Sequence, residues 1–126
     1  MAMSQIKVAP NHTEVVGSDS AVSVRNITKN YGEVEALRDM SLEFPRGQLT
    51  SLLGPSGCGK TTLLKIIAGL LEPTSGYVEV NGKTVSGPGP DRAFVFQDFA
   101  LLPWATVLNN VAFGLELRGV TRSERE

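Results

Sequence analysis

The sequence predicts an α/β fold built around a phosphate-binding loop, and three adjoining features support this prediction. Residues 54–62 match the pattern G-x-x-x-x-G-K-[ST] of a P-loop. The apolar run before them, residues 48–53, is typical of a buried strand, and residues 60–71 after them are typical of a helix. The pattern requires a strand, a loop and a helix in this order. This agreement counts against the alternative, a glycine-rich turn with an exposed lysine.

The composition narrows the possible classes of protein. With 126 residues the chain is about one small domain, which is short for a complete nucleotide-hydrolysing fold. Its 12 Lys and Arg residues against 13 Asp and Glu residues give no basic field, so we expect no nucleic-acid partner. The single cysteine, Cys58, excludes an intramolecular disulfide and favours a reducing, cytoplasmic setting. The longest apolar run, residues 63–71, is too short to span a bilayer.

Residues 1–20 are expected to form a disordered tail. They are polar and mixed, and they lack both the apolar block and the cleavage site of a secretory signal. The only histidine, His12, lies in this tail and is interpreted as a solvated side chain rather than a ligand. Ordered structure is expected over residues 21–126.

A group of short strands is expected before the loop. Residues 21–27 alternate apolar and polar side chains, as a half-buried strand does, and residues 34–38 and 40–44 repeat the alternation. Together they predict an N-terminal antiparallel β subdomain. Tyr31 falls in the predicted turn Asn30-Tyr31-Gly32. Spacing alone leaves open whether Tyr31 covers the sheet or offers a stacking platform for an adenine ring.

The residue types of the P-loop suit a triphosphate. Its glycines allow backbone angles and close approaches that a Cβ would block, so the amides of residues 57–62 can point inward around phosphate oxygens. The N-terminal end of the next helix adds unsatisfied N–H groups and a positive dipole. The Lys60 ammonium suits the β- and γ-phosphates, and the Thr61 hydroxyl suits Mg²⁺. The expected nucleotide-binding residues of the loop are Gly54, Ser56, Gly57, Cys58, Gly59, Lys60, Thr61 and Thr62.

Turn residues divide the chain after the loop into further elements. The helix over residues 60–71 has almost no polar face, which predicts burial in the core, and Pro73 and Gly76 bring it to a stop. Residues 77–85 are expected to form a hairpin across Asn81-Gly82.

A loop is expected over residues 86–91, followed by a buried core strand over residues 93–96 that ends at Gln97. The segment from Phe99 to Trp104 is unusually apolar for a loop. Burial in the core of the chain and exposure toward a partner both remain open for this segment.

Two helix starts are predicted near the C-terminal end. Thr106 is a suitable N-cap for a helix that ends at Gly119, and residues 121–126 have the pattern of a cap and first turn. The apolar face expected for the first helix consists of Leu108, Val111, Ala112 and Leu115.

Five stretches of this sequence, taken in order, resemble the ATP-binding subunit of an ABC transporter. They are residues 29–32, 54–62, 63–70, 74–76 and 95–98, and their order and spacing match the family from about residue 21 to residue 119. Within the family, three stretches resemble the nitrate, sulfonate and taurine importers. They are residues 87–92, 96–98 and 101–104.

The resemblance implies roles for the matching residues. Tyr31 stacks on the adenine of ATP, and residues 57–62 hold its phosphates. Lys60 binds the β- and γ-phosphates, Thr61 and Gln97 are ligands of Mg²⁺, and Gln97 also senses the γ-phosphate. Lys60 and Gln97 are therefore the implied catalytic residues of this chain.

The resemblance also implies partners and a location. The segment from Phe99 to Trp104 docks on a membrane-spanning permease, and the ATPase subunits form a homodimer in the full-length form. A periplasmic or lipoprotein solute-binding protein takes part indirectly. The complex imports a small anion of the nitrate, sulfonate or taurine type, and the subunit is peripheral on the cytoplasmic face of the membrane.

Three features of the family do not occur in these 126 residues. They are an LSGGQ-like signature, an apolar strand ending in Asp before a catalytic Glu, and a downstream switch His. We therefore expect the N-terminal part of such a domain, truncated before its helical subdomain and not hydrolytic alone. A non-catalytic nucleotide-binding remnant and a small P-loop kinase-like protein are the alternatives. The β-rich sequence before the P-loop, and Gln97 after Phe96, argue against the kinase.

Overall fold

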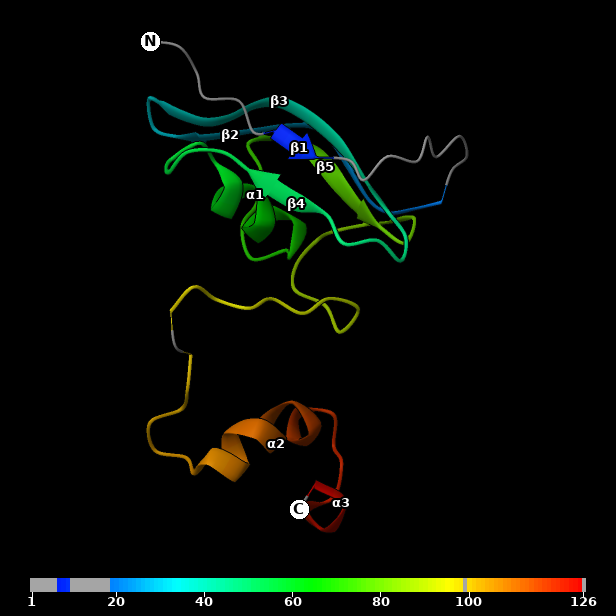
Figure 1. Ribbon diagram of the computed structural model, residues 1–126, viewed down its shortest axis with the longest axis vertical. Helices are drawn as coiled ribbons and strands as arrows, with labels where there is room; N and C mark the ends of the chain where they lie inside the picture. Colours follow the sequence, from blue (N-terminus) through cyan, green and yellow to red (C-terminus); the bar gives the residue numbers. More distant parts are fainter. Residues whose placement is uncertain (1–6, 10–18, 99, 126) are drawn as a thin grey trace. The chain divides into compact units, whose positions relative to one another are not determined.

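The computed structural model describes residues 7–9, 19–98 and 100–125. The chain divides into two compact units, Met1–Ala93 and Phe94–Glu126. The first unit contains a four-stranded antiparallel sheet in the order β3-β2-β5-β6 and a two-stranded sheet of β1 and β4 (Figure 1). The strands are β1 (Lys7–Ala9), β2 (Ser20–Tyr31), β3 (Val34–Pro45), β4 (Ser51–Leu53), β5 (Ser75–Val80) and β6 (Lys83–Thr84). Helix α1 (Lys60–Ile67) also belongs to this unit.

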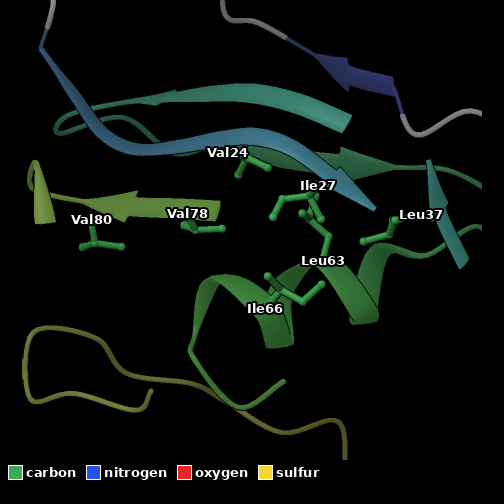
Figure 2. Packing of buried hydrophobic residues seen from close by; sticks show 7 residues of the cluster. All are labelled: Val24, Ile27, Leu37, Leu63, Ile66, Val78 and Val80. Atoms are coloured by element: carbon green, nitrogen blue, oxygen red, sulfur yellow. The ribbon is translucent and has the colours of Figure 1, made fainter. Parts of the chain in front are cut away.

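The hydrophobic core lies between the four-stranded sheet and α1. Strand residues and helix residues point toward one another there (Figure 2). Each buried aliphatic side chain stabilises the fold by about 1.5–3 kcal/mol, so this packing fixes the helix that follows the P-loop to the sheet. The core residues are Val24, Ile27, Leu37, Leu63, Ile66, Val78 and Val80.

The prediction of separate strands at residues 34–38 and 40–44 is wrong, because β3 runs through both. The strands β2 and β3 both bulge at this point. Asp39 has a φ of 41° and Asn26 a φ of 48°, and the Asn26 amide Nδ2 donates to Asp39 Oδ1 at 2.8 Å. On a regular strand, side chains alternate between the two faces, so Leu37 and Met40 would point to opposite faces. Both nevertheless pack against the core. The bulge restores their common orientation, and without it one of them would face solvent.

The hairpin predicted at Asn81-Gly82 is confirmed. β5 pairs with β6, with Val80 opposite Lys83. Both turn residues have positive φ, 50° at Asn81 and 73° at Gly82, as a type I′ turn requires.

Helix α1 is shorter than the predicted range of residues 60–71, because a glycine ends it at Ile67. Gly69 has a φ of 77° and donates its N–H to the Ile66 carbonyl at 3.0 Å. The Leu70 N–H donates to the Lys65 carbonyl at 2.9 Å. These two bonds form a Schellman motif, which satisfies the last carbonyls of a helix.

The expected burial of this helix in the core holds for one face only. Leu63 and Ile66 are buried, but Leu64 is 44% exposed. The sheet covers one face of α1, so the apolar residues on the opposite face remain accessible.

Two predicted buried strands differ in the structure. The strand expected over residues 48–53 is reduced to β4, and Leu49 is 90% exposed. Residues 93–96 form no strand, and Val95 is 92% exposed. An apolar run of this kind becomes a buried strand only between neighbouring strands. Among the described residues, β4 pairs with β1 and no strand pairs with residues 93–96.

The short strand β1 lies within the tail that was expected to be disordered. It pairs antiparallel with β4, with Val8 opposite Leu52. The prediction of disorder is therefore wrong for residues 7–9, and residues 1–6 and 10–18 lie outside the described residues.

The second unit contains α2 (Val107–Leu117) and α3 (Arg122–Arg125). The predicted cap is confirmed, since the Thr106 hydroxyl accepts from the Asn109 N–H at 3.2 Å. Gly119, with a φ of 74°, donates to the Glu116 carbonyl and ends the helix. The helix start expected from residue 121 is also confirmed, because the Thr121 hydroxyl donates to Glu124 Oε2 at 2.7 Å.

Candidate nucleotide-binding site

The backbone of the P-loop adopts angles that its glycines make accessible. Gly57 has a φ of 80° and Gly59 a φ of 96°, both in the left-handed region that favours glycine. Gly59 is also the N-cap of α1, and no side chain caps the first turn of this helix. No acidic side chain lies in that turn either. The helix N-terminus therefore offers its N–H groups and its positive dipole to an anion, as a triphosphate site requires.

Gly59 has a second reason to be glycine, because the loop packs against β3 at this residue. A Cβ at Gly59 would lie 2.6 Å from Leu37 Cδ2 and 2.7 Å from the Ala36 carbonyl oxygen. Leu37 is itself 2% exposed and belongs to the core. The hydrophobic core therefore supports the phosphate-binding loop directly.

The Lys60 ammonium lies over the loop that precedes it. Lys60 Nζ donates to the carbonyls of Gly54 at 2.6 Å and Pro55 at 2.7 Å, and it lies 3.4 Å from Cys58 Sγ. The two carbonyl acceptors are neutral. Hydrogen bonds to charged oxygens are about twice as strong as those to neutral ones, so a phosphate can displace the carbonyls.

The remaining loop residues differ in exposure. Thr61 is exposed in the first turn of α1, and Thr62 behind it is partly buried. Ser56 is exposed at the tip of the loop. Cys58 is partly buried and uses its backbone N–H within the loop, donating to the Pro55 carbonyl at 3.3 Å.

Tyr31 is the last residue of β2 and pairs with Val34, so the turn itself consists of Gly32 and Glu33 rather than the predicted Asn30-Tyr31-Gly32. Its side chain is 50% exposed. Half of the residue is thus accessible to a ligand, and both interpretations of Tyr31, as an aromatic that covers the sheet and as a stacking platform, stay predictions.

Lys29, which lies beside Tyr31 in the structure, was not predicted from the sequence. Lys29 Nζ lies 5.3 Å from the centroid of the Tyr31 ring and donates to the Glu72 carbonyl at 2.8 Å. The available signal was their spacing, since residues two apart on a strand share a face.

Two carboxylates of β3 have lowered pKa values. A hydrogen bond from the Arg38 guanidinium holds the pKa of Glu35 below its ordinary value. Partial burial raises the pKa of Glu43, but hydrogen bonds from Ser23 and Ser20 and the charge of Arg25 outweigh it, so the net pKa is lowered. Both groups therefore favour the ionised form.

Gln97 is exposed and belongs to the second unit. Its pairing with Thr61 at a Mg²⁺ ion stays a prediction. Over residues 7–9, 19–98 and 100–125, no group of three or more His, Cys, Asp or Glu side chains is placed to hold a metal.

The segment predicted to face either the core or a partner is largely exposed. Leu101 is 69% exposed and Trp104 is 81% exposed, whereas Phe99 lies outside the described residues. These two side chains are therefore not buried within the second unit. Leu101, but not Trp104, lines a mostly apolar groove of about 370 Å³, whose lining also includes Leu102, Pro103, Val107 and Val111.

No helix within the described part of the chain is both long enough and apolar enough to cross a bilayer.

The loop has two left-handed glycines, and the helix after it begins with a lysine and without a side-chain cap. These features are those of a P-loop nucleotide-binding protein. The chain belongs to the ABC transporter family, whose sequence pattern matches residues 37–126.

Similar proteins come from archaea and bacteria. The chain is 53% identical over 108 residues to an uncharacterized ABC transporter ATP-binding protein of Methanocaldococcus jannaschii, covering 82% of this chain and 40% of that protein. It is 46% identical over 110 residues to the taurine import ATP-binding protein TauB of Jannaschia sp. (strain CCS1), covering 83% of this chain and 41% of that protein. The chain therefore spans about two fifths of the length of these relatives.

A solved structure has the same fold. It is a dimeric, post-hydrolysis state of an ATP-binding cassette bound to ADP and Pi, with a TM-score of 0.65 and 31% identity. The similarity covers 82% of this chain and 52% of the solved chain. The predicted fold class, a P-loop ABC ATPase core with an N-terminal antiparallel β subdomain, is confirmed by this likeness.

Proposed function

We propose that this chain forms the ATP-binding part of an ABC importer subunit, in which Tyr31 stacks on adenine and the P-loop holds the phosphates. The single observation that carries the proposal is the loop geometry. Gly57 and Gly59 are left-handed, α1 begins without a side-chain cap, and the Lys60 ammonium lies over the loop. Each of these features serves a polyphosphate, and the residues present therefore fit Mg·ATP.

The proposal assigns residues to the Mg²⁺ ion and to the β- and γ-phosphates. Thr61 in the first turn of α1 and Gln97 supply oxygen atoms to Mg²⁺, which prefers such ligands. The bound ion would neutralise charge on the β- and γ-phosphates. Lys60 would exchange the carbonyls of Gly54 and Pro55 for phosphate oxygens.

The exposed apolar segment is the proposed contact with a permease. Leu101 lines an apolar groove in the second unit, and Trp104 is exposed on the same segment; exposed aromatic and apolar side chains are typical of interface cores. The subunit would then be peripheral on the cytoplasmic face of the membrane. The dimeric state of the solved cassette supports pairing of two ATPase subunits in the full-length form.

The proposed solute is a small anion of the nitrate, sulfonate or taurine type, delivered by a solute-binding protein. A relative at 46% identity that is named for taurine import supports this choice. Comparing uptake of taurine, an alkanesulfonate and nitrate in source cells with and without the gene tests it. Unchanged uptake of all three solutes would remove the proposed solute class.

Nucleotide binding is tested by titrating the 126-residue chain with Mg·ATP. Lys60→Ala should weaken binding by about 1.5–3 kcal/mol, because it removes a charge-assisted hydrogen bond to phosphate. Lys65→Ala is the matched control, because Lys65 is exposed on the same helix. Equal affinity of folded wild type and Lys60→Ala would exclude the P-loop as the binding site.

A further inference from the structure

We propose that Lys29 is a positioning residue for the base of the nucleotide, because it holds the Tyr31 ring so that one face is left for adenine. The inference rests on the proposed function, in which Tyr31 stacks on the base. It assigns a role to a residue outside the P-loop motif, and it predicts that Lys29 affects recognition of the base but not of the phosphates.

The geometry places the Lys29 ammonium on one face of the ring. Lys29 Nζ lies 5.3 Å from the Tyr31 centroid, within the range of a cation–π contact. The Tyr31 side chain remains 50% exposed beside this contact. A base can therefore stack only on the face that the ammonium does not cover.

The ammonium is itself held in place from the other end of α1. Lys29 Nζ donates to the Glu72 carbonyl at 2.8 Å. Two more bonds join the same loop to β2: the Thr74 N–H donates to the Thr28 carbonyl at 2.8 Å, and the Asn30 N–H donates to Thr74 Oγ1 at 3.0 Å. The loop that follows α1 therefore fixes the end of β2 on which Tyr31 lies.

Helix α1 connects the Tyr31 ring, on which the base is proposed to stack, with the phosphate-binding loop. The P-loop enters α1 at its N-terminal end, and the residues after its C-terminal end hold Lys29. A ring that is already oriented loses less conformational entropy when a ligand binds. The cation also draws electron density toward its own face, which makes the free face less negative and a better partner for an electron-rich purine.

The test compares two ligands that share phosphates but differ in the base. Calorimetric titration of the 126-residue chain with Mg·ATP and with Mg·tripolyphosphate separates the two contributions. Lys29→Met keeps the length of the side chain and removes its charge, so it should weaken ATP binding about two- to fivefold. Binding of tripolyphosphate should stay unchanged. Lys29→Arg, which keeps both a cation and a donor, should restore the affinity for ATP, and Lys83→Met on the exposed strand β6 should change neither ligand.

Tyr31→Ala separates failure of this inference from failure of the proposed function. If Tyr31→Ala weakens ATP but not tripolyphosphate, and Lys29→Met does not, the role of Lys29 alone is overturned. If Tyr31→Ala also fails to distinguish the two ligands, stacking on Tyr31 itself is wrong. An equal loss of both ligands in Lys29→Met, or no rescue by Lys29→Arg, would likewise overturn the positioning role. If Lys29→Met does not fold, Lys29→Gln, which also removes the charge, allows the same comparison of ATP with tripolyphosphate binding.

Discussion

Gly59 of the P-loop lies directly against Leu37 of β3, close enough that a Cβ at Gly59 would come within 2.6 Å of Leu37 Cδ2. Leu37 is part of the core that holds α1 to the antiparallel sheet. The support of the phosphate-binding loop thus comes from a strand that precedes it in the sequence. The loop glycine has a structural role in addition to its role beside the phosphates.

Gly59→Ala should therefore do more than strain the backbone. The left-handed conformation costs an L-residue about 1–2 kcal/mol, and displacing Leu37 adds roughly 1–3 kcal/mol. We expect the free energy of unfolding to fall by about 2–5 kcal/mol, and Mg·ATP binding to be lost. Chemical denaturation and nucleotide titration measure the two effects.

Gly57→Ala is the matched control for this substitution. Gly57 has a φ of 80°, and nothing lies within 4 Å of the position of its Cβ. Gly57→Ala should lower the free energy of unfolding only by the conformational strain of about 1–2 kcal/mol. Equal destabilisation by the two alanines would mean that the contact with Leu37 does not support the loop.

Local signals predicted much of this structure correctly, because the relevant physics is local. The type I′ turn at Asn81-Gly82 and the cap at Thr106 both depend on the conformations of a few adjacent residues. The P-loop likewise needs glycines at fixed positions, and Gly57 and Gly59 have the required positive φ.

Features that depend on distant residues were harder to predict. The bulge that makes β3 continuous requires Asn26 on one strand and Asp39 on the next, a pairing that alternation within either segment does not show. The apolar run at residues 93–96 was expected to be a buried strand, but burial of a strand depends on its neighbours. The spacing of Lys29 and Tyr31 was visible in the sequence, but the hydrogen bond that holds Lys29 was not, because the Glu72 carbonyl lies far along the chain.

Stability should depend on pH through Glu43. Its pKa is lower in the folded state than in the unfolded state, so the ionised form stabilises the fold at higher pH. This contribution is present above the unfolded pKa and is lost as the pH falls through the folded one. Glu43→Gln should therefore flatten the loss of stability in acid, by a modest amount because the Glu43 side chain is 41% exposed.

Thermal unfolding from neutral pH into the acid range measures this effect. Glu33→Gln in the exposed turn removes one carboxylate of the neighbouring hairpin without changing Glu43 and serves as a control. If Glu43→Gln and the wild type lose stability in parallel, the Arg25, Ser20 and Ser23 interactions do not contribute to the pH dependence.

Asn110 should control the order of the segment proposed to meet the permease. Its Oδ1 accepts from the Leu102 N–H at 2.7 Å, and the two hydrogens of its Nδ2 are shared among the carbonyls of Leu102, Ala105 and Thr106 at 3.0–3.2 Å. Each bond is worth about 1 kcal/mol net. Asn110→Ala should therefore speed hydrogen exchange at the Leu102 amide roughly tenfold or more.

Two variants make the Asn110 experiment specific. Asn110→Asp keeps the acceptor for Leu102 and loses the donors, so its effect should be intermediate. Asn109→Ala changes an exposed neighbour on the same helix and should leave the Leu102 amide unchanged. Wild-type exchange in Asn110→Ala would show that other contacts order the segment.

The last prediction concerns catalysis by the 126 residues alone. In the resemblance drawn from the sequence, ATP lies between the P-loop of one subunit and the signature motif of the other, and a Glu after an Asp-ending strand activates water. This sequence contains neither motif. General-base assistance alone is worth about 10²–10⁴ in rate, and the partner's groups would further stabilise the transferring phosphate.

We therefore expect the 126-residue chain to bind Mg·ATP but to release no more phosphate than a Lys60→Ala control. A longer chain that carries both motifs should hydrolyse ATP, and Gln97→Ala should reduce its activity. Release of inorganic phosphate from the two chains, followed at equal concentration, measures this difference. Lys60-dependent turnover by the 126-residue chain would contradict this division of the site.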